Sequence, residues 1–282
     1  MHTRPDCLPC FLSQALRISQ EIAPEDSALQ LQVLQTWSAK LSSLHLDRSP
    51  PAVAGELYPL LAELLRDSDP FRRHKSESNQ KALDLLPRLR ETTARSPDRL
   101  RAALNISIIG NYIDSGVAHS FDWETALHSE NQPIEAQHYE HFCRAVEASD
   151  EALILGDNSG EIALDTLLVE ELQRLGCRVT YAVRGRPIIN DATLEDAETV
   201  GLTHLCRVVS SGADTPGTVL ERCSEDFLDV MRRAPIILSK GQGNFEALAG
   251  SWPGVYFAFK VKCGVVASET GQPQGRSIFL YR

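Results

Sequence analysis

From residue 151 onward, short apolar runs alternate with stretches of helical periodicity. This alternation is typical of a parallel sheet whose strands are joined by crossover helices. The strands are expected at 152–155, 179–183, 205–209, 235–238, 255–259 and 277–281. The helices between them are expected at 160–175, 193–200, 215–233 and 243–250. The second half of the chain is therefore predicted to be α/β, with a mostly parallel sheet.

Residues 1–148 have a different texture, with helical spacing and few strand-like runs. Prolines separate the apolar patterns, because proline removes a backbone donor and disfavours helix in the residue before it. Helices are expected at 7–22, 28–45, 51–66, 77–94, 98–109 and 134–148. We therefore predict two domains, a helical N-terminal one at 1–148 and an α/β one at 149–282.

The charge balance limits the classes of partner. The formal net charge of −10 argues against nucleic-acid binding, which needs clustered Lys and Arg on one face. The one tight basic cluster, residues 72–75, is flanked by acids and is expected to be a solvated helix start. Neither a long apolar run nor a secretory signal layout is found, so we expect a cytoplasmic protein without a membrane partner. The oligomeric state is left open.

The seven cysteines are odd in number and scattered along the chain. In a reducing compartment most of them are expected to be small buried apolar groups. Cys7 and Cys10 form the one close pair, and no second pair at matching spacing completes a zinc site. A packing role is favoured for this pair, with a redox or metal role as the alternative.

Polar residues follow each of four predicted strands, at 157–161, 190–191, 240–244 and 260–262. Ligands of open parallel sheets bind beyond the carboxyl ends of the strands, so these loops are expected to share one pocket. Asp157, Asn158 and Asp191 offer carboxylate and amide oxygens, which suit Mg²⁺ or Mn²⁺. The alternative is that these residues form only turns and helix N-caps.

The segment after Asn158 opens a predicted helix, where the amides of Ser159, Gly160 and Glu161 favour an anion. Lys240 and Lys260 are expected to add positive charge to the same anion. A cation site beside an anion site favours metal-assisted hydrolysis of a phosphate ester. Aspartyl-phosphate chemistry is a rival, although Ser159 stands where that chemistry needs a second acid.

Seven short motifs, taken in order, span nearly the whole chain. They are Cys-x-x-Cys at 7–10 with Gln14, Asp-Pro-Phe at 69–71 with Lys75 and Asn79, Gly-Asn-x-x-Asp at 110–114, Gly-Asp-Asn-Ser-Gly-Glu at 156–161, Pro-Ile-Ile-Asn-Asp at 187–191, Lys-Gly-x-Gly-Asn-x-Glu at 240–246 and Lys-x-Lys-Cys at 260–263. The series resembles the metal-dependent damage-control phosphatases, long known as domain of unknown function 89 and ARMT1-like, in their cysteine-pair-bearing prokaryotic branch. Arg186 and Phe71 depart from the usual glycine and tyrosine of that pattern.

The resemblance implies a Rossmann-like, mostly parallel sheet with helices on both faces, plus an all-helical N-terminal region. It implies that the α/β domain carries a metal site made by Asp157, Asn158 and Asp191. Mn²⁺, Ni²⁺, Co²⁺ and Mg²⁺ are the candidate ions. The implied catalytic residues are Asp157, Glu161 and Lys260, and the implied substrate-binding residues are Asn111, Asp114, Ser159, Gly160, Lys240 and Asn244.

The resemblance also implies a substrate class, the small phosphorylated metabolites, which include sugar phosphates and damaged phosphometabolites. Two alternatives stay open. The first is a carboxyl methyltransferase that uses S-adenosylmethionine, because a relative with that activity has been described. The second is a non-catalytic protein that binds a phosphometabolite through the same loops.

Overall fold

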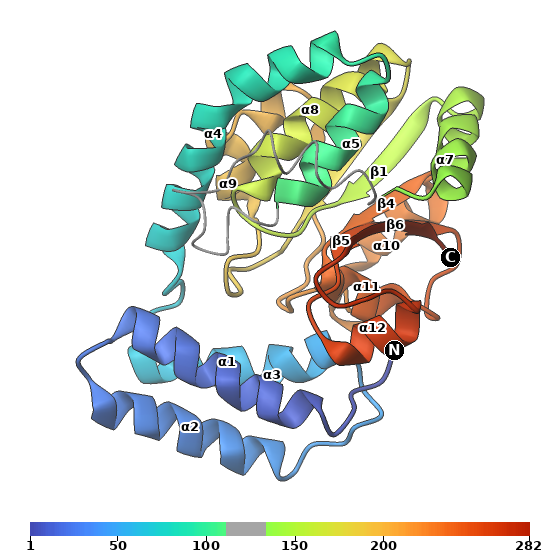
Figure 1. Cartoon of the computed structure of the whole chain (residues 1–282). Coiled ribbons are helices and arrows are strands. Elements are labelled where there is room, and N and C mark those ends of the chain that lie inside the picture. Colours follow the sequence, from blue (N-terminus) through green and yellow to red (C-terminus); the bar gives the residue numbers. More distant parts are fainter. Residues whose placement is uncertain (111–133) are drawn as a thin grey trace.

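The computed structural model describes residues 1–110 and 134–282. Its centre is one six-stranded sheet in the order β3-β2-β1-β4-β5-β6 (Figure 1). The strands are β1 (Glu151–Leu155), β2 (Arg178–Val183), β3 (Arg207–Ser210), β4 (Ile237–Lys240), β5 (Val255–Lys260) and β6 (Ser277–Tyr281). Strands β1 to β5 are parallel, and β6 is antiparallel to β5. The predicted mostly parallel α/β fold is confirmed.

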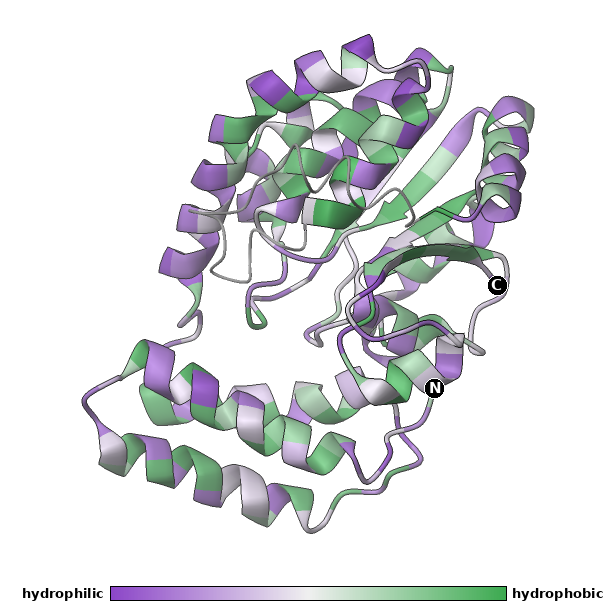
Figure 2. Cartoon of the chain, in the orientation of Figure 1, coloured by the Kyte–Doolittle hydropathy of each residue, from purple (hydrophilic) through white to green (hydrophobic). Residues whose placement is uncertain are grey.

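Helices cover both faces of the sheet, as expected. The inward residues of β1 alternate between two cores: Ala152 and Ile154 belong to one, Leu153 and Leu155 to the other. The first core includes side chains of α4 (Arg72–Arg95), α5 (Arg99–Ile109), α7 (Ala136–Ala148), α8 (Glu161–Arg174) and α9 (Leu194–Thr199). The second includes side chains of α10 (Glu225–Arg233), α11 (Gln242–Leu248) and α12 (Gly264–Thr270). Figure 2 shows the strands as mostly apolar and the outer face of α4 as polar.

The first three helices pack around a core of their own. They are α1 (Cys7–Ile22), α2 (Ser27–Leu41) and α3 (Pro50–Leu65). Trp37 is fully buried there, with its ring centroid 5.2 Å from that of Tyr58. Ile188, from the loop after β2, joins this core and ties the three helices to the sheet edge. Since α4, α5 and α7 instead share a core with the sheet, the division into domains at residue 148 stays a prediction.

The helix expected at 215–233 is wrong in its first half. Only α10, residues 225–233, and a short 3₁₀ turn at 220–222 are helical. Pro216 lacks a backbone donor, and Gly217 has a φ of 151°, outside the helical region. The backbone N–H and the hydroxyl of Thr218 both donate to the amide oxygen of Asn244, each at 2.8 Å. This tertiary contact and the bend at residues 215–217 take the place of the first helical turns. The helix α12 was not expected at all.

Two expectations about exposure also fail. Helix α4 begins at Arg72, and the Lys75 side chain is buried with its ammonium 2.8 Å from Asp69, so the basic cluster is not simply a solvated helix start. Of the seven free cysteines only Cys177 is buried, whereas Cys10 is exposed and the others are partly exposed. The prediction that most cysteines are buried is therefore wrong. Across 1–110 and 134–282, no helix combines the length and the apolar character needed to cross a bilayer.

Candidate active site

The loops after β1 and β2 meet at the carboxyl edge of the sheet. The backbone N–H of Ala192 donates to the carbonyl of Asp157 at 2.8 Å, and that of Ser159 donates to the carbonyl of Asn190 at 2.8 Å. An isolated antiparallel bridge also pairs Asn158 with Asp191. The register of two adjacent parallel strands thus brings the three predicted metal-binding residues together.

The side chains of this group are buried and tightly connected. The Asn158 amide nitrogen donates to Asp157 Oδ2 and to Glu161 Oε1, both at 3.0 Å. Asp191 Oδ2 accepts from Arg184 Nε at 2.6 Å, and Arg184 Nη2 lies 3.8 Å from Asp157 Oδ1. Arg184 lies outside the motif that contains Asp191, and the sequence analysis gave it no role in the site.

The turn after β4 leaves room for the Asp157 carboxylate. Gly241 has a φ of 80°, a conformation that L side chains rarely adopt. A Cβ atom at this position would lie 2.0 Å from Asp157 Oδ2. The glycine is therefore required both by the backbone conformation and by the close approach of the acid.

Backbone strain accompanies the loop that carries Asp191. Ile189 has a φ of 45°, which is unusual for a β-branched side chain. The preceding residue, Ile188, is buried in the core of the first three helices. Strained conformations persist only where the surrounding structure imposes them, and they are frequent at functional sites.

Lys240 lies beneath the carboxylates. Its side chain is fully buried, with Nζ 2.8 Å from Asp165 Oδ1, 3.4 Å from Glu161 Oε2 and 3.0 Å from the Ser107 carbonyl. Asp165 also accepts a hydrogen bond from the Tyr181 hydroxyl at 2.6 Å. In this arrangement the ammonium forms an ion pair with the Glu161 carboxylate. A direct contact of Lys240 with substrate stays a prediction.

The buried acids influence one another's protonation. Burial raises the pKa of Asp157 to about 6, and the nearby carboxylate of Asp191 adds to the shift. Burial likewise raises the pKa of Glu161 to about 7, against the opposing effect of Lys240. A carboxyl group with such a pKa exchanges protons near neutral pH, as general acids and bases do.

The donor set fits a divalent cation. Four buried carboxylates, those of Asp157, Glu161, Asp165 and Asp191, face two buried cations, Lys240 and Arg184. Burial disfavours the ionised form of these acids, as the raised pKa values of Asp157 and Glu161 indicate, and a divalent cation beside them would favour the ionised form. Carboxylate and amide oxygens suit Mg²⁺ and Mn²⁺. Within the described part of the chain no three His, Cys, Asp or Glu side chains form a metal-binding group, so the candidate site depends on two acids and the Asn158 amide.

Three predicted substrate-binding residues are engaged with the protein itself. The Gly160 N–H donates to Asn79 Oδ1 at 2.7 Å, and the Ser159 hydroxyl donates to Asp196 Oδ1 at 3.1 Å. The Asn244 amide nitrogen donates to the carbonyls of Gly156 and Lys240, at 3.0 and 2.7 Å. In this structure the start of α8 is thus capped by a side chain of α4, and substrate roles for these residues stay predictions.

Lys260, Asn111 and Asp114 are the remaining predicted residues. Lys260 ends β5, where it is partly exposed, and pairs in register with Ser277 of β6. Lys262 is exposed, and its charge opposes the raised pKa of Asp157 and of Glu161, so it lies within electrostatic reach of both. Asn111 and Asp114 lie outside the described residues.

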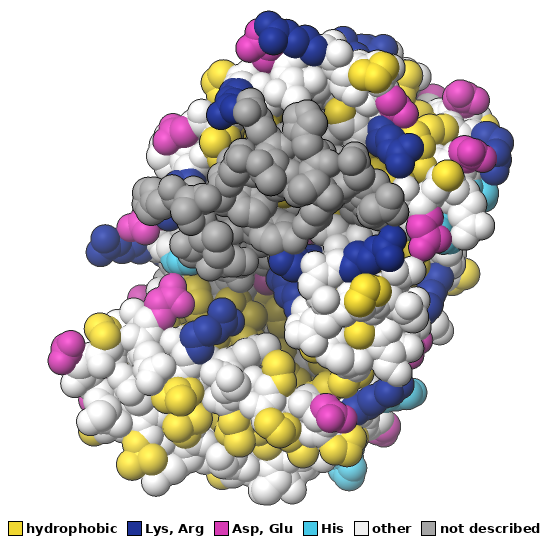
Figure 3. All heavy atoms as spheres, in the orientation of Figure 1, with side chains coloured by type: hydrophobic (Ala, Val, Ile, Leu, Met, Phe, Trp, Pro, Cys, Tyr) yellow, Lys and Arg dark blue, Asp and Glu magenta, His cyan; other side chains and the backbone are white. Residues whose placement is uncertain are grey.

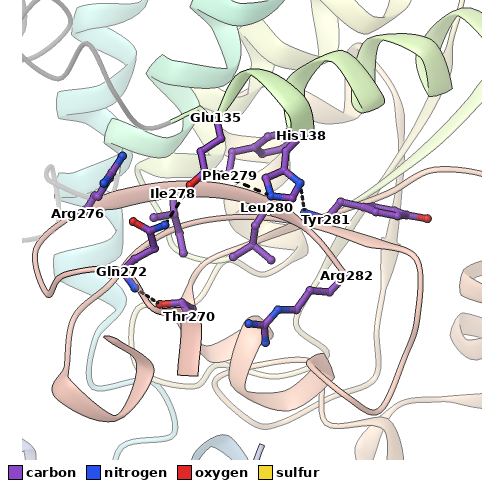
Figure 4. A pocket seen from close by; sticks show the side chains of 10 residues that line it. All are labelled: Glu135, His138, Thr270, Gln272, Arg276, Ile278, Phe279, Leu280, Tyr281 and Arg282. Carbon is purple, nitrogen blue, oxygen red and sulfur yellow. Dashed lines mark hydrogen bonds and ion pairs between the residues drawn. The ribbon is translucent and has the colours of Figure 1, made fainter. Parts of the chain in front are cut away.

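The surface of the described residues includes a recess and a separate cavity. Figure 3 shows a recess between the three N-terminal helices and the α/β part, with hydrophobic and basic side chains on its walls. A separate cavity of about 180 Å³ lies along β6, lined in part by Glu135, His138 and Gln272 (Figure 4). Its polar groups pair with one another, since Gln272 donates to Glu135 at 3.0 Å. None of the predicted site residues lines this cavity, so the candidate site stays the cluster at the strand ends.

The buried charge of Lys240 leads to a stability prediction. Replacing Lys240 with Met would leave Asp165 and Glu161 buried without their ammonium partner. We expect the free energy of unfolding to fall by about 3 kcal/mol or more, as for other broken buried ion pairs. Urea denaturation near neutral pH measures this. Arg232→Met, which removes exposed ion pairs with Asp229 and Glu225, is the control and should have no measurable effect. A Lys240→Met variant as stable as this control would contradict the expectation.

Comparison with known proteins supports these observations. A profile of the damage-control phosphatase ARMT1-like domain matches residues 3–278. The chain is 30% identical to a damage-control phosphatase of Pyrococcus horikoshii over 290 residues, which cover 99% of this chain and 98% of that protein. It is 26% identical to a damage-control phosphatase of Archaeoglobus fulgidus, over 96% of each chain. A crystal structure of a DUF89 family protein from Pyrococcus horikoshii superposes with a TM-score of 0.88, at 27% identity, covering 100% of this chain and 99% of that one.

Proposed function

Since the chain belongs to the ARMT1-like damage-control phosphatase family, we propose that it is a phosphatase that hydrolyses small phosphorylated metabolites with a divalent metal ion. The observation that carries this proposal is the buried cluster of Asp157, Asn158 and Asp191, whose carboxylate and amide groups meet beyond the ends of β1 and β2. When bound, such an ion polarises a phosphoryl oxygen and lowers the pKa of a coordinated water.

The protein's own residues divide the remaining work. Glu161, with a pKa raised to about 7, holds or releases a proton at its carboxyl group near neutral pH. Lys240 Nζ lies 3.4 Å from Glu161 Oε2 and holds that carboxyl group in place. Lys260, the last residue of β5, and Lys262, two residues beyond it, provide positive charge that offsets the charge of the phosphoryl group.

The finer assignments follow from the same site. Mn²⁺, Ni²⁺, Co²⁺ and Mg²⁺ are all compatible with oxygen ligands, although carboxylate and amide donors favour Mg²⁺ and Mn²⁺. Sugar phosphates and damaged phosphometabolites are the proposed substrates, because the named relatives are damage-control phosphatases. A cytoplasmic location and the lack of a nucleic-acid partner stay predictions.

A phosphate-release assay tests the proposal. Purified protein is incubated with a panel of phosphometabolites, with each of the four ions in turn and with a chelator alone. We expect phosphate release from some members of the panel that stops in chelator and returns when the ion is added in excess. Undiminished release after exhaustive chelation would contradict metal dependence, and no release with any ion would contradict the activity.

The same preparation separates the two alternatives. Calorimetric titration with S-adenosylmethionine that gives tight binding, together with no phosphate release, would support the carboxyl methyltransferase. Saturable binding of a phosphometabolite without turnover, with every ion, would support a binding protein. The proposed phosphatase predicts neither result.

A further inference from the structure

Arg184, the first residue after β2, is buried with its guanidinium in contact with three different segments of the chain. Nε donates to Asp191 Oδ2 at 2.6 Å in its own loop. Nη2 donates to Asn244 Oδ1 at 3.1 Å in α11, and Nη1 lies 3.4 Å from the Thr218 hydroxyl in the loop after β3. Only 2% of its surface is exposed. The Arg184 side chain thus holds these three segments in fixed positions relative to one another.

Asn244 continues this set of contacts across the sheet edge. Its nitrogen donates to the carbonyl of Gly156, just before Asp157, and to that of Lys240 at the end of β4. Its oxygen accepts from Arg184 and from the backbone and hydroxyl of Thr218. All the hydrogen-bonding capacity of the amide is used. Asp191 and the strand end that carries Asp157 are therefore linked through two fully buried side chains.

We propose that Arg184 is a positioning residue for the candidate metal centre, which fixes the Asp191 carboxylate relative to Asp157 by anchoring it to Asn244 and Thr218. The inference rests on the proposed function, because it concerns the same two acids. A guanidinium is a rigid fork that holds several acceptors in fixed directions, whereas a lysine ammonium is a point charge. The three-segment contact uses this fork.

The competing account is that Arg184 supplies charge alone. Its Nη2 lies 3.8 Å from Asp157 Oδ1, so a single positive charge at this place would partly offset both acids. The two accounts differ for Arg184→Lys, which keeps the charge and loses the fork. Arg90→Lys is the matched control, because Arg90 also forms a forked pair with an acid, Glu170, but on the exposed side of α4.

The experiment measures Mn²⁺ affinity of the full chain by calorimetry, and kcat and KM for phosphate release. For Arg184→Lys we expect Mn²⁺ affinity and kcat each to fall by about 10-fold to 100-fold, the usual cost of losing a group that orients a metal ligand. The KM for the phosphometabolite should change little, because Arg184 is not expected to touch it. Arg90→Lys should match the wild type in all three quantities.

Thr218→Val provides a second variant should Arg184→Lys fail to fold. It retains Arg184 and removes only the hydroxyl anchor. We expect it to weaken Mn²⁺ binding in the same direction by a smaller factor. Wild-type Mn²⁺ affinity in a folded Arg184→Lys variant, or in Thr218→Val where Arg184→Lys does not fold, would overturn the positioning role.

The outcomes distinguish the two proposals. If the wild type binds Mn²⁺ but releases no phosphate, the proposed function fails and the affinities still decide the role of Arg184. If the wild type binds and hydrolyses normally, and Arg184→Lys does the same, only the positioning role fails. If the wild type binds another of the four ions but not Mn²⁺, that ion replaces Mn²⁺ in the affinity measurement. If it binds none of the four, both proposals are overturned together.

Discussion

Replacing Asp157 with Asn is expected to lower metal-dependent phosphate release by about 10³-fold or more, since a metal contributes several kcal/mol of transition-state stabilisation. The substitution keeps the shape of the side chain and removes one of the two carboxylates proposed to hold the ion. Asp157 is buried just beyond the end of β1, where its carboxylate accepts a hydrogen bond from the Asn158 amide. Initial rates of phosphate release with saturating Mn²⁺ measure the effect.

The same variant should be at least as stable as the wild type without metal. The pKa of Asp157 is raised in the folded state to about 6. At low pH the acid is fully protonated, and its burial then carries no cost of burying a charge. As pH rises through about 6, the ionised acid costs folding free energy, and Asn avoids that cost. Urea denaturation in chelator therefore should show a relative gain for Asp157→Asn above pH 6 and none at acidic pH. Loss of activity with loss of folding would count against the assigned role.

Gly241→Ala is expected to damage both activity and folding. Its Cβ would lie 2.0 Å from Asp157 Oδ2, and the φ of 80° is strained for alanine. Either the acid or the turn must move, and a displacement of about 1 Å in a catalytic group costs about 10²-fold in rate. We expect phosphate release to fall by at least that factor, and the free energy of unfolding to fall by about 2 kcal/mol or more.

Gly250→Ala is a control that separates the steric clash with Asp157 from the backbone strain of a positive φ. Gly250 has a nearly identical φ of 83°, but a Cβ added there would meet no heavy atom of the described residues within 4 Å. It should lose about 1–2 kcal/mol of stability from the backbone alone and retain wild-type activity. If both alanine variants hydrolyse the substrate equally well, the close approach of Gly241 to Asp157 has no role in the reaction.

Local patterns predicted the sheet and the meeting of its loops, because the carboxyl ends of adjacent parallel strands share an edge. The contacts of Asp157 with the loop of Asp191 follow from that rule, whereas the strand order was not predicted. Ile189 shows the limit of such patterns. Its left-handed conformation contradicts the preference of a β-branched residue, and only the surrounding packing imposes it.

Lys75 and Asn79, which the sequence placed only in a motif, have partners that lie far away along the chain. Lys75 and Asn79 of α4 reach Asp196 of α9, and Asn79 caps the start of α8. These contacts depend on how helices far apart in sequence pack, which no local spacing encodes. The failed helix at 215–233 has the same origin, because Thr218 bonds to Asn244 instead of continuing a helical turn. Arg184 escaped notice because a lone arginine after a strand has no distinctive spacing.

Anomalous diffraction from crystals soaked in Mn²⁺ tests the central claim most directly. The account predicts one strong anomalous peak coordinated by the carboxylates of Asp157 and Asp191, and its loss in crystals of Asp157→Asn. An ordered Mn²⁺ ion bound away from these two acids, in a protein whose phosphate release depends on Mn²⁺, would contradict it.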